Sequence, residues 1–166
     1  MARLAARGAA GLVLAVVVLA AVLLQGQRAW ARDHSFLVIA PPGWTQSFAA
    51  VATDDSTPLL RLSAQASDGS RGYVVVDHAP AVLPDRLDQL VTNAGPVQCE
   101  SPATSTSVGT ADALLTDCRT AEARLEVIYI TRGDRHYVAV LSAADTQFDH
   151  LRSDFRSMLD SWAWQR

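Results

Sequence analysis

Two cysteines, Cys99 and Cys118, offer the most definite chemistry in this chain. Such a pair can form a structural disulfide, cycle between redox states or contribute to a metal site. The C-x-x-C spacing of redox pairs is absent, and two cysteines alone leave a zinc shell incomplete. Because an even number of cysteines in an exported chain favours pairing, we predict a disulfide between Cys99 and Cys118.

Four histidines, His34, His78, His136 and His150, are candidates for metal binding. No two of them are four positions apart, and the pattern H-E-x-x-H does not occur. The sequence therefore predicts no metal site. The glycine patterns G-x-G-x-x-G and G-x-x-x-x-G-K, which bind phosphate groups, are also missing, so we predict no cofactor.

Asp77 and His78, together with one of the many serines, are the residue types of a catalytic triad. The nucleophile motif G-x-S-x-G is absent, so solvated residues at a strand end are the simpler interpretation. We expect no catalytic residues. A small envelope hydrolase with an unrecognised site is kept as an alternative, which requires a serine to meet His78, His136 or His150 in a pocket.

Trp44 follows a turn in the segment "PPGW" and has two interpretations. An aromatic side chain beside prolines can be displayed to grip a ligand. Alternatively, it folds back to close the core, with Tyr137, Phe155 and Trp162 as candidate neighbours. Because tryptophan is highly buried on average, we interpret Trp44 as an anchor of the fold.

The first 31 residues resemble a secretory signal or a membrane anchor. Two arginines precede an uncharged run from Gly8 to Leu24, and the A-x-A pattern at Ala29–Ala31 marks a cleavage site between Ala31 and Arg32. A spanning helix needs roughly 17–25 apolar residues, so membrane attachment through residues 8–24 remains open. Both interpretations place residues 32–166, which we expect to form one domain, outside the cytoplasm.

The charge balance argues against a polyanionic partner. The chain has 17 acidic residues against 14 basic ones, for a net charge of −3, and every basic residue is an arginine. No basic stripe occurs along the sequence. We therefore expect no nucleic-acid binding.

Apolar and polar residues alternate in several segments, which is typical of half-buried strands. Short turns such as Arg132-Gly133-Asp134 separate them. This tripeptide also matches an integrin-recognition motif, but we interpret it as the tip of a hairpin. We expect residues 59–67 and 73–79 to pair as one hairpin. The predicted strands cover residues 35–40, 59–67, 73–79, 113–120, 123–131 and 135–143.

Two segments show helical rather than strand periodicity. Residues 83–94 carry an apolar face and end at Gly95-Pro96, and residues 145–164 form a longer amphipathic helix, with Asp145 or Thr146 as its cap. Strands linked as hairpins, with two main helices, describe an α+β domain with a mostly antiparallel sheet.

The order of these motifs resembles the PsbP-like fold family, which includes DcrB- and LpqN-type bacterial envelope proteins. The segment "PPGW" is similar to the family's P-x-GW opening. The closing hairpin "EVIYITRGDRHYVAVLSA" and the terminal helix "FDHLRSDFRSMLDSWAW" are similar to the family's ending. The resemblance implies a three-layer α/β/α sandwich, with Trp44 as part of the fold signature, and a non-enzymatic role.

We therefore expect an exported, disulfide-stabilised, non-enzymatic binding or accessory domain at the bacterial cell envelope. Its partner would be an unknown envelope protein or a small ligand. A second alternative is a membrane-anchored accessory subunit of a secretion or transport complex. The expected binding surface is the groove where a flexible loop, Ser101 to Asp112, meets the sheet.

Overall fold

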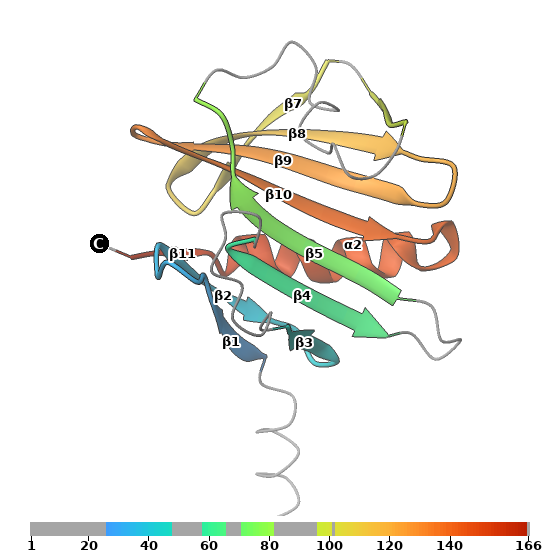
Figure 1. The fold of residues 1–166 in the computed structure, drawn as a ribbon, viewed down its shortest axis with the longest axis horizontal. Helices are drawn as coiled ribbons and strands as arrows, with labels where there is room; N and C mark the ends of the chain where they lie inside the picture. The colour runs from blue at the N-terminus through green and yellow to red at the C-terminus, as the bar shows by residue number, and fades with distance from the viewer. Residues whose placement is uncertain (1–25, 48–57, 66–70, 82–95, 101, 166) are drawn as a thin grey trace, which may run out of the picture.

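Segments with alternating apolar and polar residues form most of the structure, a computed structural model that describes residues 26–47, 58–65, 71–81, 96–100 and 102–165. An eight-stranded antiparallel sheet has the order β3-β4-β5-β10-β9-β8-β6, with β7 paired to β8 (Figure 1). Its strands are β3 (Trp44–Gln46), β4 (Leu60–Gln65), β5 (Arg71–His78), β6 (Gln98–Cys99), β7 (Thr104–Val108), β8 (Ala111–Arg119), β9 (Arg124–Arg132) and β10 (Arg135–Ala143). The expected β4–β5 hairpin and the antiparallel sheet are confirmed.

Helix α2 (Asp145–Asp160) covers one face of this sheet and lies behind β5 and β10 in Figure 1. Its apolar side chains recur every three or four residues, so they form one buried stripe. This stripe packs into the main core with the inward side chains of the strands. The buried residues of the helix are Phe148, Leu151, Phe155, Met158 and Leu159.

The helix begins at the predicted residue, Asp145, but its cap and its C-terminal end differ from the prediction. Ala144 is the N-cap and no side chain caps the helix, so the expected cap at Asp145 or Thr146 is wrong. Asp145 instead lies in the first turn, where its negative charge suits the helix dipole. The helix also ends early, because Ala163–Trp164 forms strand β11 by pairing with β2 (Phe36–Ala40).

A small three-stranded sheet joins the two ends of the described chain. Its order is β1-β2-β11, and β1 (Gln27–Trp30) pairs with β2 in an antiparallel register. Phe36 of β2 stacks on Trp162, with 4.2 Å between ring centroids, so both ends contribute to one aromatic cluster. The sequence analysis assigned β1 to the leader and did not predict this strand.

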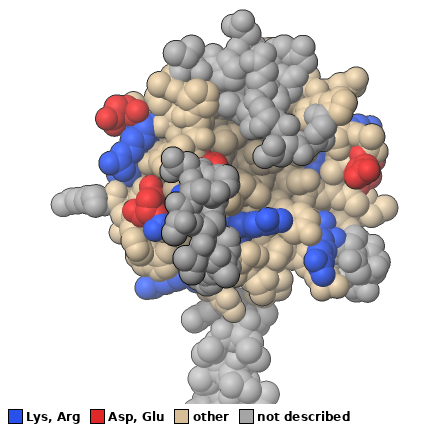
Figure 2. All heavy atoms as spheres, viewed as in Figure 1, with Lys and Arg blue, Asp and Glu red and all other residues tan. Residues whose placement is uncertain are grey.

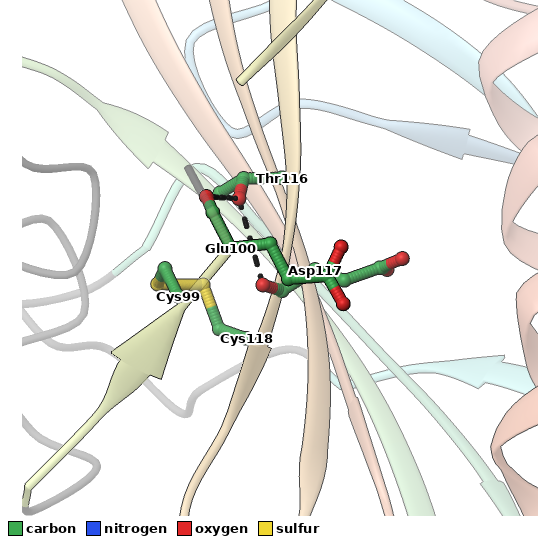
Figure 3. Close-up of a disulfide and its surroundings, with 5 residues drawn as sticks. All are labelled: Cys99, Glu100, Thr116, Asp117 and Cys118. Atoms are coloured by element: carbon green, nitrogen blue, oxygen red, sulfur yellow. Dashed lines mark hydrogen bonds between the residues drawn. A yellow bond between two sulfur atoms is a disulfide. The ribbon is translucent and has the colours of Figure 1, made fainter. Parts of the chain in front are cut away.

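The predicted disulfide between Cys99 and Cys118 is confirmed (Figure 3). The two cysteines lie directly opposite each other on β6 and β8. Beside them, Thr116 donates a hydrogen bond of 2.7 Å to the carbonyl oxygen of Glu100. The disulfide therefore fixes the edge strand β6 against the sheet.

A buried ionic network joins α2 to the sheet. Glu126 on β9 is fully buried and accepts hydrogen bonds from Arg152 Nε, at 3.0 Å, and from the guanidinium of Arg156, at 2.8 Å. Arg152 also donates two hydrogen bonds to Asp117. Burial lowers the pKa of Arg152, but the charges and hydrogen bonds of Glu126 and Asp117 raise it above its ordinary value.

Two expectations about the architecture need correction. The described residues contain one helix, so two main helices and a third, helical layer are not confirmed. The second expected helix, residues 83–94, lies outside the described residues. The expected flexible loop Ser101–Asp112 is wrong over its described part. Polar, β-branched residues there pair as a β7–β8 hairpin around Gly109, whose φ of 58° suits a tight turn.

No helix in the described part of the chain is long and apolar enough to span a membrane. The candidate anchor, residues 8–24, lies outside that part.

Candidate functional site

A groove of about 870 Å³ lies on the face of the large sheet that α2 does not cover. Strand alternation forms its floor: Leu62 and Val74 are buried on the helix side, and their neighbours point the other way. Ser63 and Tyr73 are direct cross-strand partners on β4 and β5, so both belong to this outer face. The floor therefore comes from β4 and β5, with Thr45 and Gln46 of β3 at its edge.

The chain that follows β1 forms the wall of the groove. The backbone N–H of Arg32 donates a 2.7 Å hydrogen bond to the carbonyl oxygen of Leu59. Gln46 Nε2 donates a 2.9 Å hydrogen bond to the carbonyl oxygen of Trp30. These two bonds hold the end of β1 against β3 and β4. The Trp30 side chain is 40% exposed at this wall.

A tight turn presents His34 at the same wall. His34 has φ of 58°, a left-handed conformation that is uncommon for a side-chain-bearing residue. Asp33 stabilises the turn because its Oδ1 accepts hydrogen bonds from the backbone N–H and the hydroxyl of Ser35, at 3.0 and 2.6 Å. Burial raises the pKa of Asp33, but the Ser35 hydrogen bonds and the nearby His78 lower it below its ordinary value.

Replacing this carboxylate is expected to weaken the turn in a pH-dependent way. A depressed folded-state pKa means that Asp33 stabilises the fold above its ordinary pKa, and that this contribution disappears as the pH falls through the folded-state value. Because the group is largely solvated, we expect Asp33→Asn to cost about 0.5–1 kcal/mol at pH 7. Urea unfolding of both proteins at neutral and strongly acidic pH measures this difference.

Asp134→Asn, at the exposed tip of the β9–β10 hairpin, is the control for loss of one negative charge. It is expected to leave the free energy of unfolding unchanged at pH 7. An Asp33→Asn effect that persists undiminished at acidic pH would contradict the role assigned to the carboxylate.

Three arginines, Arg32, Arg61 and Arg71, line the groove. No described residue of its lining is acidic, and none of the three has a carboxylate partner in the described part of the chain. The guanidinium of Arg61 lies over the ring of Tyr73, 5.2 Å from its centroid. Figure 2 shows arginine side chains over β4 and β5 on this face, so the groove is locally basic in an acidic protein.

The arginines near the helix have a different environment. Arg119 and Arg124 approach Asp145, and Arg152 and Arg156 bind the buried Glu126. Their charges are therefore neutralised by the protein itself. Among the described residues, no carboxylate takes up the donors of the groove arginines.

The residues predicted to anchor the fold, form the disulfide or flank the cleavage site lie in different parts of the molecule. Trp44 is 2% exposed, and its Nε1 donates a 2.8 Å hydrogen bond to Asp154 on α2, so it lies on the core side of the sheet. Cys99 and Cys118 lie near the opposite edge of the sheet from the groove. Ala31 is buried in the core, and Arg32 follows it at the groove wall.

The histidines do not converge with a serine among the described residues. His136 Nδ1 lies 3.0 Å from the hydroxyl of Tyr129, while His78 lies 3.9 Å from Asp33. Burial raises the pKa of Tyr129. His150 is exposed on α2. Within the described ranges, no group of three metal-binding side chains is close enough to hold an ion.

This groove was not predicted, although part of the residue pattern that forms it is visible in the sequence. The alternation in residues 59–67 places Arg61 on the outer face, and Tyr73 follows from the pairing of the next strand. The contribution of Trp30 was hidden because the A-x-A pattern assigned it to the leader, and Arg32 was expected only as the first residue of the domain.

Solved structures share this fold at low sequence identity. Cyanobacterial PsbP (CyanoP) from Synechocystis sp. PCC 6803 matches with a TM-score of 0.56 and 15% identity, over 86% of this chain and 94% of its own. LpqN, involved in cell envelope biogenesis of Mycobacterium tuberculosis, matches with a TM-score of 0.54 and 12% identity, over 86% and 91%. A protein from Bacteroides thetaiotaomicron VPI-5482 matches with a TM-score of 0.52 and 10% identity, over 86% of this chain and 49% of its own. No model of a protein family and no curated protein matches the chain.

Proposed function

The chain has a PsbP-like fold, and from this premise we propose that it is an exported, non-enzymatic accessory domain of the bacterial cell envelope. It binds a partner or a small ligand in the groove between β1 and the outer face of β3, β4 and β5. The leader-like segment before β1 and the likeness to LpqN, a protein of envelope biogenesis, support the location. The described disulfide agrees with an oxidising compartment.

One observation carries the binding role: the groove combines exposed aromatic surface with arginines that have no carboxylate partner in the described ranges. A concave site lined by apolar side chains and a few polar groups is the usual form of a ligand site. The volume of about 870 Å³ falls in the range of small-molecule sites. Charged donors left without internal partners are expected where a ligand supplies the partner.

The arrangement supports binding more than catalysis. Hydrolysis by a serine needs a base within hydrogen-bonding distance of the hydroxyl. In the described ranges, the polar partners of His78 and His136 are Asp33, Tyr129 and Thr131, none of which is a serine. The described contacts of His78 and His136 therefore give the hydrolase alternative no support.

Membrane attachment is a second candidate, and strand β1 favours it. Ala29 and Ala31 belong to the main core, so cleavage after Ala31 would remove a strand that the fold uses. A protein that keeps β1 either is cut before Gln27 or retains residues 8–24 as an anchor. Retention would hold the groove near the membrane surface.

Photocrosslinking from the groove wall tests the binding role. We expect a photoreactive phenylalanine analogue at position 30 to capture a discrete molecule in intact cells, because the Trp30 side chain is exposed beside the groove. The same analogue at His150, exposed on α2, is the matched control and is expected to give no such product. Equal labelling from both positions, or none from position 30, would contradict a binding role of the groove.

A further inference from the structure

We propose that the groove binds a small anion through its carboxylate or phosphate groups, with Arg61 and Arg71 as the anion-binding residues and Trp30 and Tyr73 as apolar contact surfaces. This proposal rests on the proposed function, because it names the chemical class of the ligand for the same groove. Charge, spacing and pre-organisation of the groove residues support it.

The groove lining differs in charge from the chain as a whole. The whole chain carries a net charge of −3, yet the described lining contains arginines and no acidic residue. A guanidinium presents five donors in a planar fork, which matches the oxygens of a carboxylate or a phosphate. No described carboxylate pairs with Arg61 or Arg71, and an anionic ligand can supply such a partner.

Strand register sets the spacing of the two arginines. Arg71 lies opposite Gln65, and Arg61 is four residues from Gln65 along β4. At about 3.3 Å per residue, the two backbone positions are roughly 13 Å apart on one face. Long arginine side chains can converge over this distance on one anionic group, or each can bind one end of a compact ligand. Ser63 and Tyr73 lie between them and supply further polar contacts.

Tyr73 also pre-organises the site. Its ring supports the guanidinium of Arg61 at 5.2 Å, a cation–π contact that restricts the side chain before a ligand arrives. Restricting a long side chain in advance lowers the entropy lost on binding. Trp30 is 40% exposed at the opposite wall and can cover the apolar part of a ligand.

A small anion fits these features better than a polyanion or an anionic membrane. The described basic residues of the groove are confined to one concavity, whereas a polymer or a bilayer would also face the acidic remainder of the surface. A large anion would therefore be repelled by the acidic surface around the groove. A ligand enclosed by the groove avoids this repulsion.

The test titrates the full chain with citrate and pyrophosphate at constant ionic strength, by calorimetry and by NMR of the Trp30 indole N–H. The trimethyl ester of citrate is the uncharged control. We expect at least one anion to bind saturably and to shift the Trp30 signal. Combined Arg61→Gln and Arg71→Gln substitutions are expected to weaken binding about tenfold or more, because each removes charge-assisted hydrogen bonds.

The matched control is Arg135→Gln, since Arg135 is exposed and lies outside the groove lining. It is expected to bind within about twofold of the natural chain, because a distant exposed charge contributes little. Equal weakening by Arg135→Gln, or equal binding of the trimethyl ester, would overturn the proposal. So would binding only of phosphatidylglycerol vesicles or a polyglutamate peptide, with no binding of either small anion.

The two hypotheses can fail separately. Specific photocrosslinking from position 30, without binding of citrate or pyrophosphate, keeps the groove as a binding site and rejects an anionic ligand. Absence of both signals rejects the groove itself. Unchanged thermal unfolding of the arginine variants, which replace exposed side chains, shows that lost binding is not lost folding.

Discussion

A chain that begins at Arg32 is expected to be less stable than a chain that begins at Gln27 by about 3–5 kcal/mol. The shorter chain loses the buried side chains of Ala29 and Ala31, worth roughly 0.8 kcal/mol per methyl group. It also loses the β1–β2 ladder and the Gln46–Trp30 bond, each hydrogen bond contributing about 1 kcal/mol net. Urea unfolding of the two chains measures the difference.

The same reasoning predicts where the natural protein begins. Protein recovered from the envelope and analysed by intact mass is expected to start at or before Gln27, so that β1 is kept. Equal unfolding midpoints of the two chains would contradict the role of β1. Recovery of a stable species beginning at Arg32 would restore the predicted cleavage between Ala31 and Arg32.

Glu126→Gln is expected to destabilise the protein by about 1–3 kcal/mol, the size of lost charge-assisted hydrogen bonds. Glu126 is fully buried and pairs with both Arg152 and Arg156, which reach it from α2. The amide keeps the shape of the side chain but removes the charge that both guanidinium groups face. Arg152 keeps its pair with Asp117, and the Arg156 side chain is 52% exposed, so the loss stays below the cost of a fully buried charge left unpaired. Chemical unfolding at pH 7 measures the loss, and near-ultraviolet circular dichroism shows whether α2 still packs.

The control for this prediction is an ion pair on the surface of the same helix. Asp149 pairs with Arg124 at 3.3 Å, but its side chain is 81% exposed. Asp149→Asn is expected to cost less than about 1 kcal/mol, because exposed pairs are weak. Similar losses for the two variants would show that Glu126 does not hold α2 on the sheet.

Much of the large sheet could be predicted because burial on one face leaves a period of two in the sequence. Leu60 and Leu62 alternate with polar residues, and the residues of β9 and β10 flank a Gly-Asp turn. The disulfide was also predictable, since two cysteines in an exported chain allow one pairing. These features depend on local pattern or on composition alone.

The parts that could not be predicted depend on contacts between distant segments. Strand β1 is short, and its Ala29 together with Ala31 also fits a cleavage motif, so the local pattern favoured a leader over a strand. Ala163–Trp164 continues a helical pattern and becomes a strand only because β2 offers it an edge. The groove combines the end of β1 with the outer face of β4 and β5, which no single segment reveals.

If the chain is exported, as proposed above, the small sheet has a consequence for the timing of its folding. Leu37 pairs with Ala163, and Phe36 pairs with Trp164, so in an exported chain this sheet cannot close until these C-terminal residues have crossed the membrane. Contacts between segments so far apart in sequence form late, because a long loop must be ordered first. Strand β2 therefore stays without its partner strand β11 until the C-terminal residues arrive. Proteases and chaperones outside the membrane meet an open chain for the whole of this interval.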